Sequence, residues 1–147
     1  MDMGKHGIKV TLVLAILLTV ACSGPSVAGT IYVKWDSTNN GPGNDWAHAF
    51  HTVTAALNAA QANDEIWVAG NSAHPYVERI TLKVDVGLYG GFTGSETQLT
   101  ERNWKTNETI LDGNQGGSVV TSPSGATFTT RVDGFFIRNG SARSTGG

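Results

Sequence analysis

The chain is nearly without cysteine, because Cys22 is the single cysteine among 147 residues. One thiol cannot form a disulfide within the chain, and a cysteine-based metal site needs several thiols. Charge is also sparse, with 10 basic and 12 acidic residues. No cluster of lysine or arginine predicts a nucleic-acid partner, and no run of one sign predicts a charged tail.

Local signatures of catalysis and cofactor binding are missing as well. Residues 87–94 contain four glycines, but no Lys-Ser/Thr pair accompanies them and no amphipathic helix follows, so we interpret them as turns rather than a phosphate loop. No local motif supports a Ser–His–Asp arrangement. We therefore predict no cofactor from these patterns.

The amino-terminal stretch has the three-part layout of a secretory signal peptide. Lys5 and Lys9 give a short positive region, an uncharged apolar run covers residues 10–21, and Ser23-Gly24-Pro25 breaks any helix. The apolar run is too short to span a bilayer comfortably. The pattern predicts a secreted or cell-surface protein that touches a membrane only through its signal peptide or a lipid anchor.

Two processing sites compete within this stretch. Ser26 and Ala28 are the small residues that signal peptidase requires, which predicts a signal peptide over residues 1–28 and a mature domain over residues 29–147. Thr19-Val20-Ala21-Cys22 instead resembles a lipoprotein box, although Thr19 replaces the usual leucine. We prefer cleavage after Ala28 and keep lipidation of Cys22 as the alternative.

One helix is readable in the mature domain. Apolar residues at Phe50, Val53, Leu57 and Ala60 have the spacing of one helical face, and the pattern ends at Asn63-Asp64. We expect one strand before this helix over residues 31–33 and another directly after it over residues 65–69.

A short apolar strand followed by a glycine-containing turn then recurs. Its centres are Trp67, Leu88, Ile110 and Val132, separated by 21, 22 and 22 residues. Further strand candidates lie between or after these centres, at residues 79–82, 118–121 and 135–137.

This spacing has a structural meaning. Stacked turns ~4.8 Å apart would pair each strand in parallel with its counterpart one period away. A β-sandwich would instead show strands every ~8–12 residues, joined by hairpins. We therefore predict an all-β fold, a right-handed parallel β-helix of about four coils of ~22 residues, with an N-terminal capping α-helix.

The two ends of such a coil expose apolar core and strand edges unless something covers them. The helix that begins near Phe50 is placed to cover the N-terminal opening. Residues 138–147 are turn-like and offer no such cover. We therefore expect truncation at the C-terminus, further coils downstream, and end-to-end self-association.

Several segments resemble bacterial right-handed parallel β-helix repeat proteins with the pectate-lyase-like fold. These segments are Asp-Trp-Ala-His-Ala-Phe at 45–50, Asp-Glu-Ile-Trp-Val-Ala at 64–69, and residues 87–97, 102–104, 109–114 and 132–137. The resemblance covers residues 31–140 and implies a fold found in large secreted or surface proteins. It does not imply one activity, because the same coil hosts lyases, hydrolases, adhesins and structural stalks.

Asp112 and Asp133 are the candidate catalytic residues. They lie 21 residues apart at the same place in successive periods, and we expect them to stack on one face. Paired carboxylates of this kind serve as acids and bases in glycoside hydrolases and as Ca²⁺ ligands in pectate lyases. The favoured interpretation is that both are turn residues before glycine, so we assign no catalytic residue.

Two other groups of side chains have the composition of a binding site. Asp45, His48 and His51 have ligand-like spacing, but a solvated helix edge is the favoured interpretation and we predict no metal site. Aromatic residues offer either a sugar-stacking platform or packing between coils. They are Trp35, Trp46, Trp67, Trp104, Tyr32, Tyr76 and Tyr89.

Two functions remain. The first is a non-enzymatic extracellular or cell-surface scaffold that contacts polysaccharide or a host surface. The second is the N-terminal part of a polysaccharide lyase or glycoside hydrolase, and under the lyase alternative Ca²⁺ is the expected cofactor.

Overall fold

The computed structural model describes residues 28–38 and 41–142, so Cys22 and the rest of the predicted signal peptide up to residue 27 lie outside the described residues. Regular structure within these ranges consists of short strands and two short helices. In chain order they are β1 (Thr30–Val33), α1 (Val53–Ala59), β2 (Glu65–Ala69), β3 (Ile80–Thr81), β4 (Gly87–Phe92), the 3-10 helix η1 (Leu99–Glu101), β5 (Thr109–Asp112), β6 (Val120–Thr121), β7 (Arg131–Asp133) and β8 (Phe135–Arg138). In this part of the chain, no helix has the length and apolar character needed to cross a membrane.

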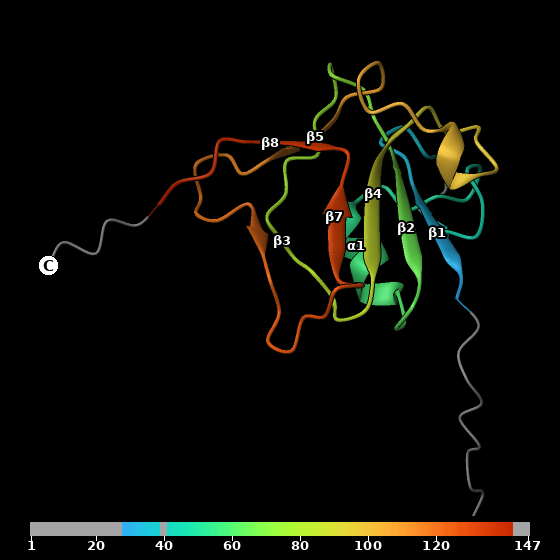
Figure 1. Ribbon diagram of the computed structural model, residues 1–147. Helices are drawn as coiled ribbons and strands as arrows, with labels where there is room; N and C mark the ends of the chain where they lie inside the picture. Colours follow the sequence, from blue (N-terminus) through green and yellow to red (C-terminus); the bar gives the residue numbers. More distant parts are fainter. Residues whose placement is uncertain (1–27, 39–40, 143–147) are drawn as a thin grey trace, which may run out of the picture.

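The strands form three sheets, and every pairing is parallel. Sheet A has the order β1-β2-β4-β7, sheet B pairs β5 with β8, and sheet C pairs β3 with β6 (Figure 1). An isolated parallel bridge between Tyr76 and Leu111 adds an earlier segment to sheet B. From β2 onward the chain therefore visits sheets A, B and C in the same order, twice in full, before β7 and β8 begin the order again.

The strand register differs from the predicted repeat. Leu88 lies opposite Ile66, 22 residues earlier, but its partner on the other side is Val132, 44 residues later. Ile110 belongs to sheet B, where it lies opposite Phe136. The predicted equivalence of Ile110 with Leu88 and Val132 is therefore wrong.

The physical reason lies in the connection after β4. Residues 93–108, which include η1, carry the chain only from sheet A to sheet B. One full coil, from Leu88 of β4 to its partner Val132 of β7, therefore takes 44 residues, about twice the expected period. A short apolar strand before a glycine looks the same in the sequence whichever sheet it joins, so spacing alone could not separate the two.

One hydrophobic core lies between the three sheets. Ile66 and Leu88 of sheet A and Leu111 of sheet B are fully or almost fully buried, and Ile80 of sheet C packs into the same cluster. Because side chains alternate along a strand, Glu65, Gly87 and Tyr89 lie on the opposite, outer face of sheet A.

Helix α1 closes this core beside β1, β2 and β3, behind sheet A in Figure 1. Thr52 caps it by accepting the Ala55 N–H at 3.2 Å, and Val53 and Leu57 are buried on its inner face. The helix is shorter than predicted, because Phe50 lies outside it in a parallel bridge with Val33. Its first turn is also held by Glu78, whose carboxylate accepts the backbone N–H groups of the first two helical residues at 3.0 and 2.8 Å.

Candidate binding groove on sheet A

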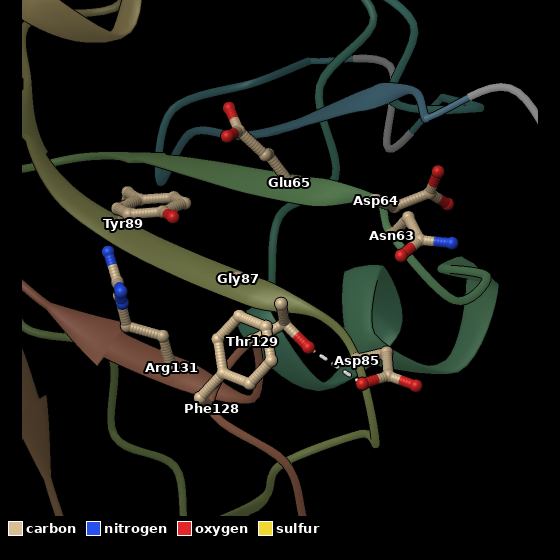
Figure 2. A pocket seen from close by; sticks show the side chains of 9 residues that line it. All are labelled: Asn63, Asp64, Glu65, Asp85, Gly87, Tyr89, Phe128, Thr129 and Arg131. Carbon is tan, nitrogen blue, oxygen red and sulfur yellow. Dashed lines mark hydrogen bonds between the residues drawn. The ribbon is translucent and has the colours of Figure 1, made fainter.

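A groove of about 290 Å³ crosses the starts of three neighbouring strands on the outer face of sheet A (Figure 2). Asp64 and Glu65 border it at β2, Gly87 and Tyr89 at β4, and Arg131 at β7. The parallel register explains this convergence, because Glu65, Gly87 and Arg131 are direct partners across the sheet. Residues from three distant parts of the chain therefore form one row.

Gly87 and Tyr89 form the floor of the groove. The Tyr89 ring folds back over Gly87, and a Cβ at Gly87 would lie 2.7 Å from the ring. Any side chain at position 87 would therefore displace the ring. Since Glu65 and Arg131 flank Gly87 in the sheet, the half-buried ring lies between an acidic and a basic side chain.

Glu65 and Arg131 are held differently, and a third charged group, the Arg102 guanidinium, lies over the ring with its carbon 5.3 Å from the ring centroid. The Glu65 carboxylate accepts the indole N–H of Trp67 at 2.9 Å, which fixes its position. The Arg131 guanidinium points toward the Tyr89 ring in Figure 2 and makes no ion pair or side-chain hydrogen bond with any other described residue. Its donors are therefore available to a ligand.

A threonine-rich turn forms the remaining wall. Asp85 accepts hydrogen bonds from the hydroxyls of Thr127 and Thr129, and its backbone N–H donates to Thr130 Oγ1 at 3.0 Å. These hydroxyl donors hold the pKa of the Asp85 carboxyl below its usual range. The turn also presents Phe128, whose side chain is 89% exposed at the rim of the groove.

The proposed aromatic platform is mostly a packing feature. Trp67 is buried and stacks on Phe92 with ring centroids 4.8 Å apart, while Tyr76 is buried and donates its hydroxyl to the Ala69 carbonyl at 2.9 Å. Burial raises the pKa of the Tyr76 phenol. Trp35 stacks on His74. Among the seven aromatic candidates, Tyr89 alone lines this groove.

The candidate catalytic carboxylates do not come together. Asp112 lies on sheet B opposite Arg138, whereas Asp133 lies on sheet A opposite Tyr89. The prediction that they stack is therefore wrong, and the reason is the longer turn between β4 and β7. Each carboxylate pairs with its own arginine at 2.9 Å, Asp112 with Arg138 and Asp133 with Arg102.

Asp112 has the geometry of a turn residue. Its Oδ1 accepts the backbone N–H of Asn114 at 2.9 Å, and its Oδ2 accepts bonds from Arg138 and Asn139. The backbone bond, followed by the Arg138 guanidinium, lowers the pKa of the Asp112 carboxyl.

The histidine candidates also separate. His48 Nδ1 lies 2.9 Å from Asp45 Oδ1, but His51 Nδ1 lies 3.1 Å from the Trp35 carbonyl oxygen instead. Across residues 28–38 and 41–142, no three acidic, histidine or cysteine side chains are grouped to hold a metal ion.

Sequence reasoning did not identify the groove. Glu65 and Arg131 belong to strands that were predicted, but only the register of β2, β4 and β7 reveals that they are neighbours. Asp85 and Phe128 lie in connecting turns with no motif. The sequence offers no signal for either residue, because a single apolar side chain in a turn is common on protein surfaces.

Comparison of the chain with protein-family models, curated proteins and solved structures finds no match. The resemblance to bacterial β-helix repeat proteins therefore stays a prediction.

Proposed function

We propose that this chain forms an exported right-handed parallel β-helix, a secreted or cell-surface scaffold whose sheet A groove binds polysaccharide. The observation that carries the binding proposal is the row of Glu65, Gly87 and Arg131 across three parallel strands, with the Tyr89 ring folded over Gly87.

The repeated order of the sheets supports the β-helix. A chain that passes through sheets A, B and C in the same sequence, with parallel pairing in each, winds around one core. Connections between parallel strands of one sheet are right-handed in nearly all proteins, so the same hand is proposed here. The signal-peptide layout of residues 1–28 supports export.

The chemistry of the groove supports a saccharide. A sugar ring presents an apolar face for stacking and hydroxyl groups around its edge, so it is matched by an aromatic ring flanked by hydrogen-bonding side chains. Tyr89 and Phe128 supply rings, Arg131 supplies donors, and Glu65 supplies an acceptor.

The charge of the lining selects among saccharides. Glu65 and Asp85 provide two carboxylates against the single guanidinium of Arg131, while the Asp64 carboxylate is occupied by the N–H groups of Gly29 and Gln61. A polyuronate would bring further negative charge into this excess, which disfavours it. We therefore propose a neutral polysaccharide as the ligand.

Affinity electrophoresis tests this proposal with the secreted protein. Gels would contain a neutral glucan, a neutral mannan, a neutral xylan or polygalacturonate. A neutral polymer should retard the wild-type protein, and Phe128→Ala and Arg131→Ala should each weaken retardation several-fold. Both side chains are exposed, so the fold should be preserved.

Trp104→Ala is the matched control, because this ring is 46% exposed but lies outside the groove. Equal loss in Trp104→Ala and Phe128→Ala, or no retardation by any neutral polymer, would refute the proposed site. A Ca²⁺-dependent release of unsaturated products from polygalacturonate, abolished by Asp112→Asn or Asp133→Asn, would instead establish the lyase alternative.

A further inference from the structure

The start of β1 lies against a buried carboxylate. The Gly29 backbone nitrogen donates to Asp64 Oδ1 at 2.8 Å, and the Gly29 carbonyl accepts the Glu65 N–H at 2.9 Å. Gly29 is exposed, whereas Asp64 is only 8% exposed. The two groups approach closely, since a Cβ at Gly29 would lie 3.3 Å from Asp64 Oδ1.

Asp64 lacks a cationic partner among the residues that the structure describes. Its Oδ2 accepts the Gln61 N–H at 2.7 Å, and no lysine, arginine or histidine of the described ranges forms an ion pair with it. Buried carboxylates are usually paired with a positive charge, because neutral amide donors replace only part of the lost hydration.

Processing of the chain would supply that charge. We propose that cleavage after Ala28 makes Gly29 the mature amino terminus, and that its ammonium group forms an ion pair with Asp64. This inference rests on the export part of the proposed function. It assigns a structural purpose to the cleavage position, which lies at the nitrogen that already contacts the carboxylate.

The chemical step balances without any further reactant than water. Hydrolysis breaks the C–N bond between Ala28 and Gly29 and joins the water oxygen to the Ala28 carbonyl carbon. Both hydrogens of the water end on the Gly29 nitrogen, so a carboxylate and an ammonium group result. The neutral N–H donor of the precursor thereby becomes a charged donor, which strengthens its hydrogen bond to Asp64.

The pair would join three elements at the capped end of the molecule. Asp64 precedes β2, Gly29 precedes β1, and Gln61 belongs to the turn after α1. Lipidation at Cys22 would leave Gly29 as an internal amide and would not create the pair. The presence of the ion pair would therefore distinguish cleavage after Ala28 from lipidation at Cys22.

The first experiment uses the full chain, expressed with its own leader in a secreting bacterium. Amino-terminal sequencing and intact mass should identify Gly29 as the first residue of the exported protein. The purified protein is then acetylated at its α-amine near neutral pH, where lysine reacts more slowly. Acetylation keeps an N–H group but removes the charge.

Thermal unfolding is measured for the free and acetylated forms of wild type and Asp64→Asn. Acetylation should lower the Tm of the wild-type protein by on the order of 4 °C and leave that of Asp64→Asn nearly unchanged. The α-amine should also react several-fold more slowly in wild type than in a peptide with the same first residues. Measurement of this acetylation rate requires only the wild-type protein, so it tests the ion pair even if Asp64→Asn does not fold.

Each outcome has a distinct meaning. A mature terminus at Cys22 or elsewhere overturns the inference but leaves export intact. A Gly29 terminus with equal Tm shifts in both proteins, or with an unprotected amine, overturns the ion pair. An unprocessed chain retained in the cytoplasm overturns both export and the inference.

Discussion

The two ends of the stacked strands differ in how their edges are covered. At the amino-terminal end, residues 43–50 lie beside β1: Tyr32 N–H donates to the Gly43 carbonyl and Lys34 N–H to the Phe50 carbonyl, each at 2.9 Å. Helix α1 then covers the core beside them. At the other end, no described strand lies beyond β7 or β8, and Phe136 and Ile137 are 42% and 51% exposed.

The comparison shows that burial here depends on neighbours more than on residue type. Leu111 and Ile137 are partners on adjacent strands of sheet B, yet Leu111 is fully buried while half of Ile137 is exposed. Leu111 has β8 on one side and the Tyr76 segment on the other, whereas Ile137 has a partner on one side only.

The largest expected effect is the difference in stability loss between alanine variants of these two strand partners, Leu111 and Ile137. Leu111→Ala should lower the free energy of unfolding by about 3 kcal/mol, because it leaves a cavity in a closed core. Ile137→Ala should cost less than about 1 kcal/mol, because the side chain is already half in water. Urea unfolding of the purified protein measures both. Equal losses would show that the two ends do not differ in packing.

Self-association should use the open end alone. Because the β1 edge is already hydrogen-bonded, end-to-end growth should stop at a dimer joined through β7 and β8 rather than continue into filaments. Phe136→Lys should weaken that dimer about tenfold or more in sedimentation velocity, since a lysine on an edge strand opposes pairing. Trp104→Lys, at an exposed ring in the connection between β4 and β5, is the control. Filaments, or equal weakening by both variants, would contradict the expectation.

The capped end was the part of the molecule most accessible to sequence reasoning. The spacing of Val53 and Leu57 reports a local helical face, and β2 was placed at residues 65–69 because its boundaries are local too. The open end was harder, because the partner of β4 depends on how far residues 93–108 carry the chain. That distance is a tertiary property, so the pairing of Leu88 with Val132 and the groove built on it were not visible in the spacing.

Glu78 gives a smaller test of the cap itself. Its carboxylate accepts hydrogen bonds from the backbone of Val53 and Thr54 and from the Thr54 hydroxyl, at 2.6 to 3.0 Å. Glu78→Ala should therefore lower the free energy of unfolding by about 1 kcal/mol, as the loss of a helix cap does. Hydrogen exchange should rise in α1 and β1 while β7 and β8 stay unchanged. Glu108→Ala, which removes a half-buried glutamate outside the cap, is the control, and a matching change there would argue against a specific role.

The smallest expected effect concerns pH at the open end, where Asp112 joins β5 to Arg138 and Asn139. The Asn114 backbone N–H and then Arg138 lower the folded-state pKa of Asp112 below the ordinary aspartate value of 3.8. The carboxylate therefore contributes stability above about pH 4, and this contribution is lost as pH falls through the lower folded-state pKa.

Asp112→Asn should accordingly reduce Tm at pH 6, and the difference from wild type should shrink as the pH approaches 2. Faster hydrogen exchange should appear in residues 135–139 and spare β1 and β2, because within the described part of the chain the Asp112 side chain bonds only to Asn114, Arg138 and Asn139. Asp36→Asn, at an exposed carboxylate of the capped end, is the control. A Tm difference that is independent of pH would assign the effect to altered packing of the turn. Hydrogen exchange that rises equally in β1 and in residues 135–139 would show that the two ends unfold as one unit.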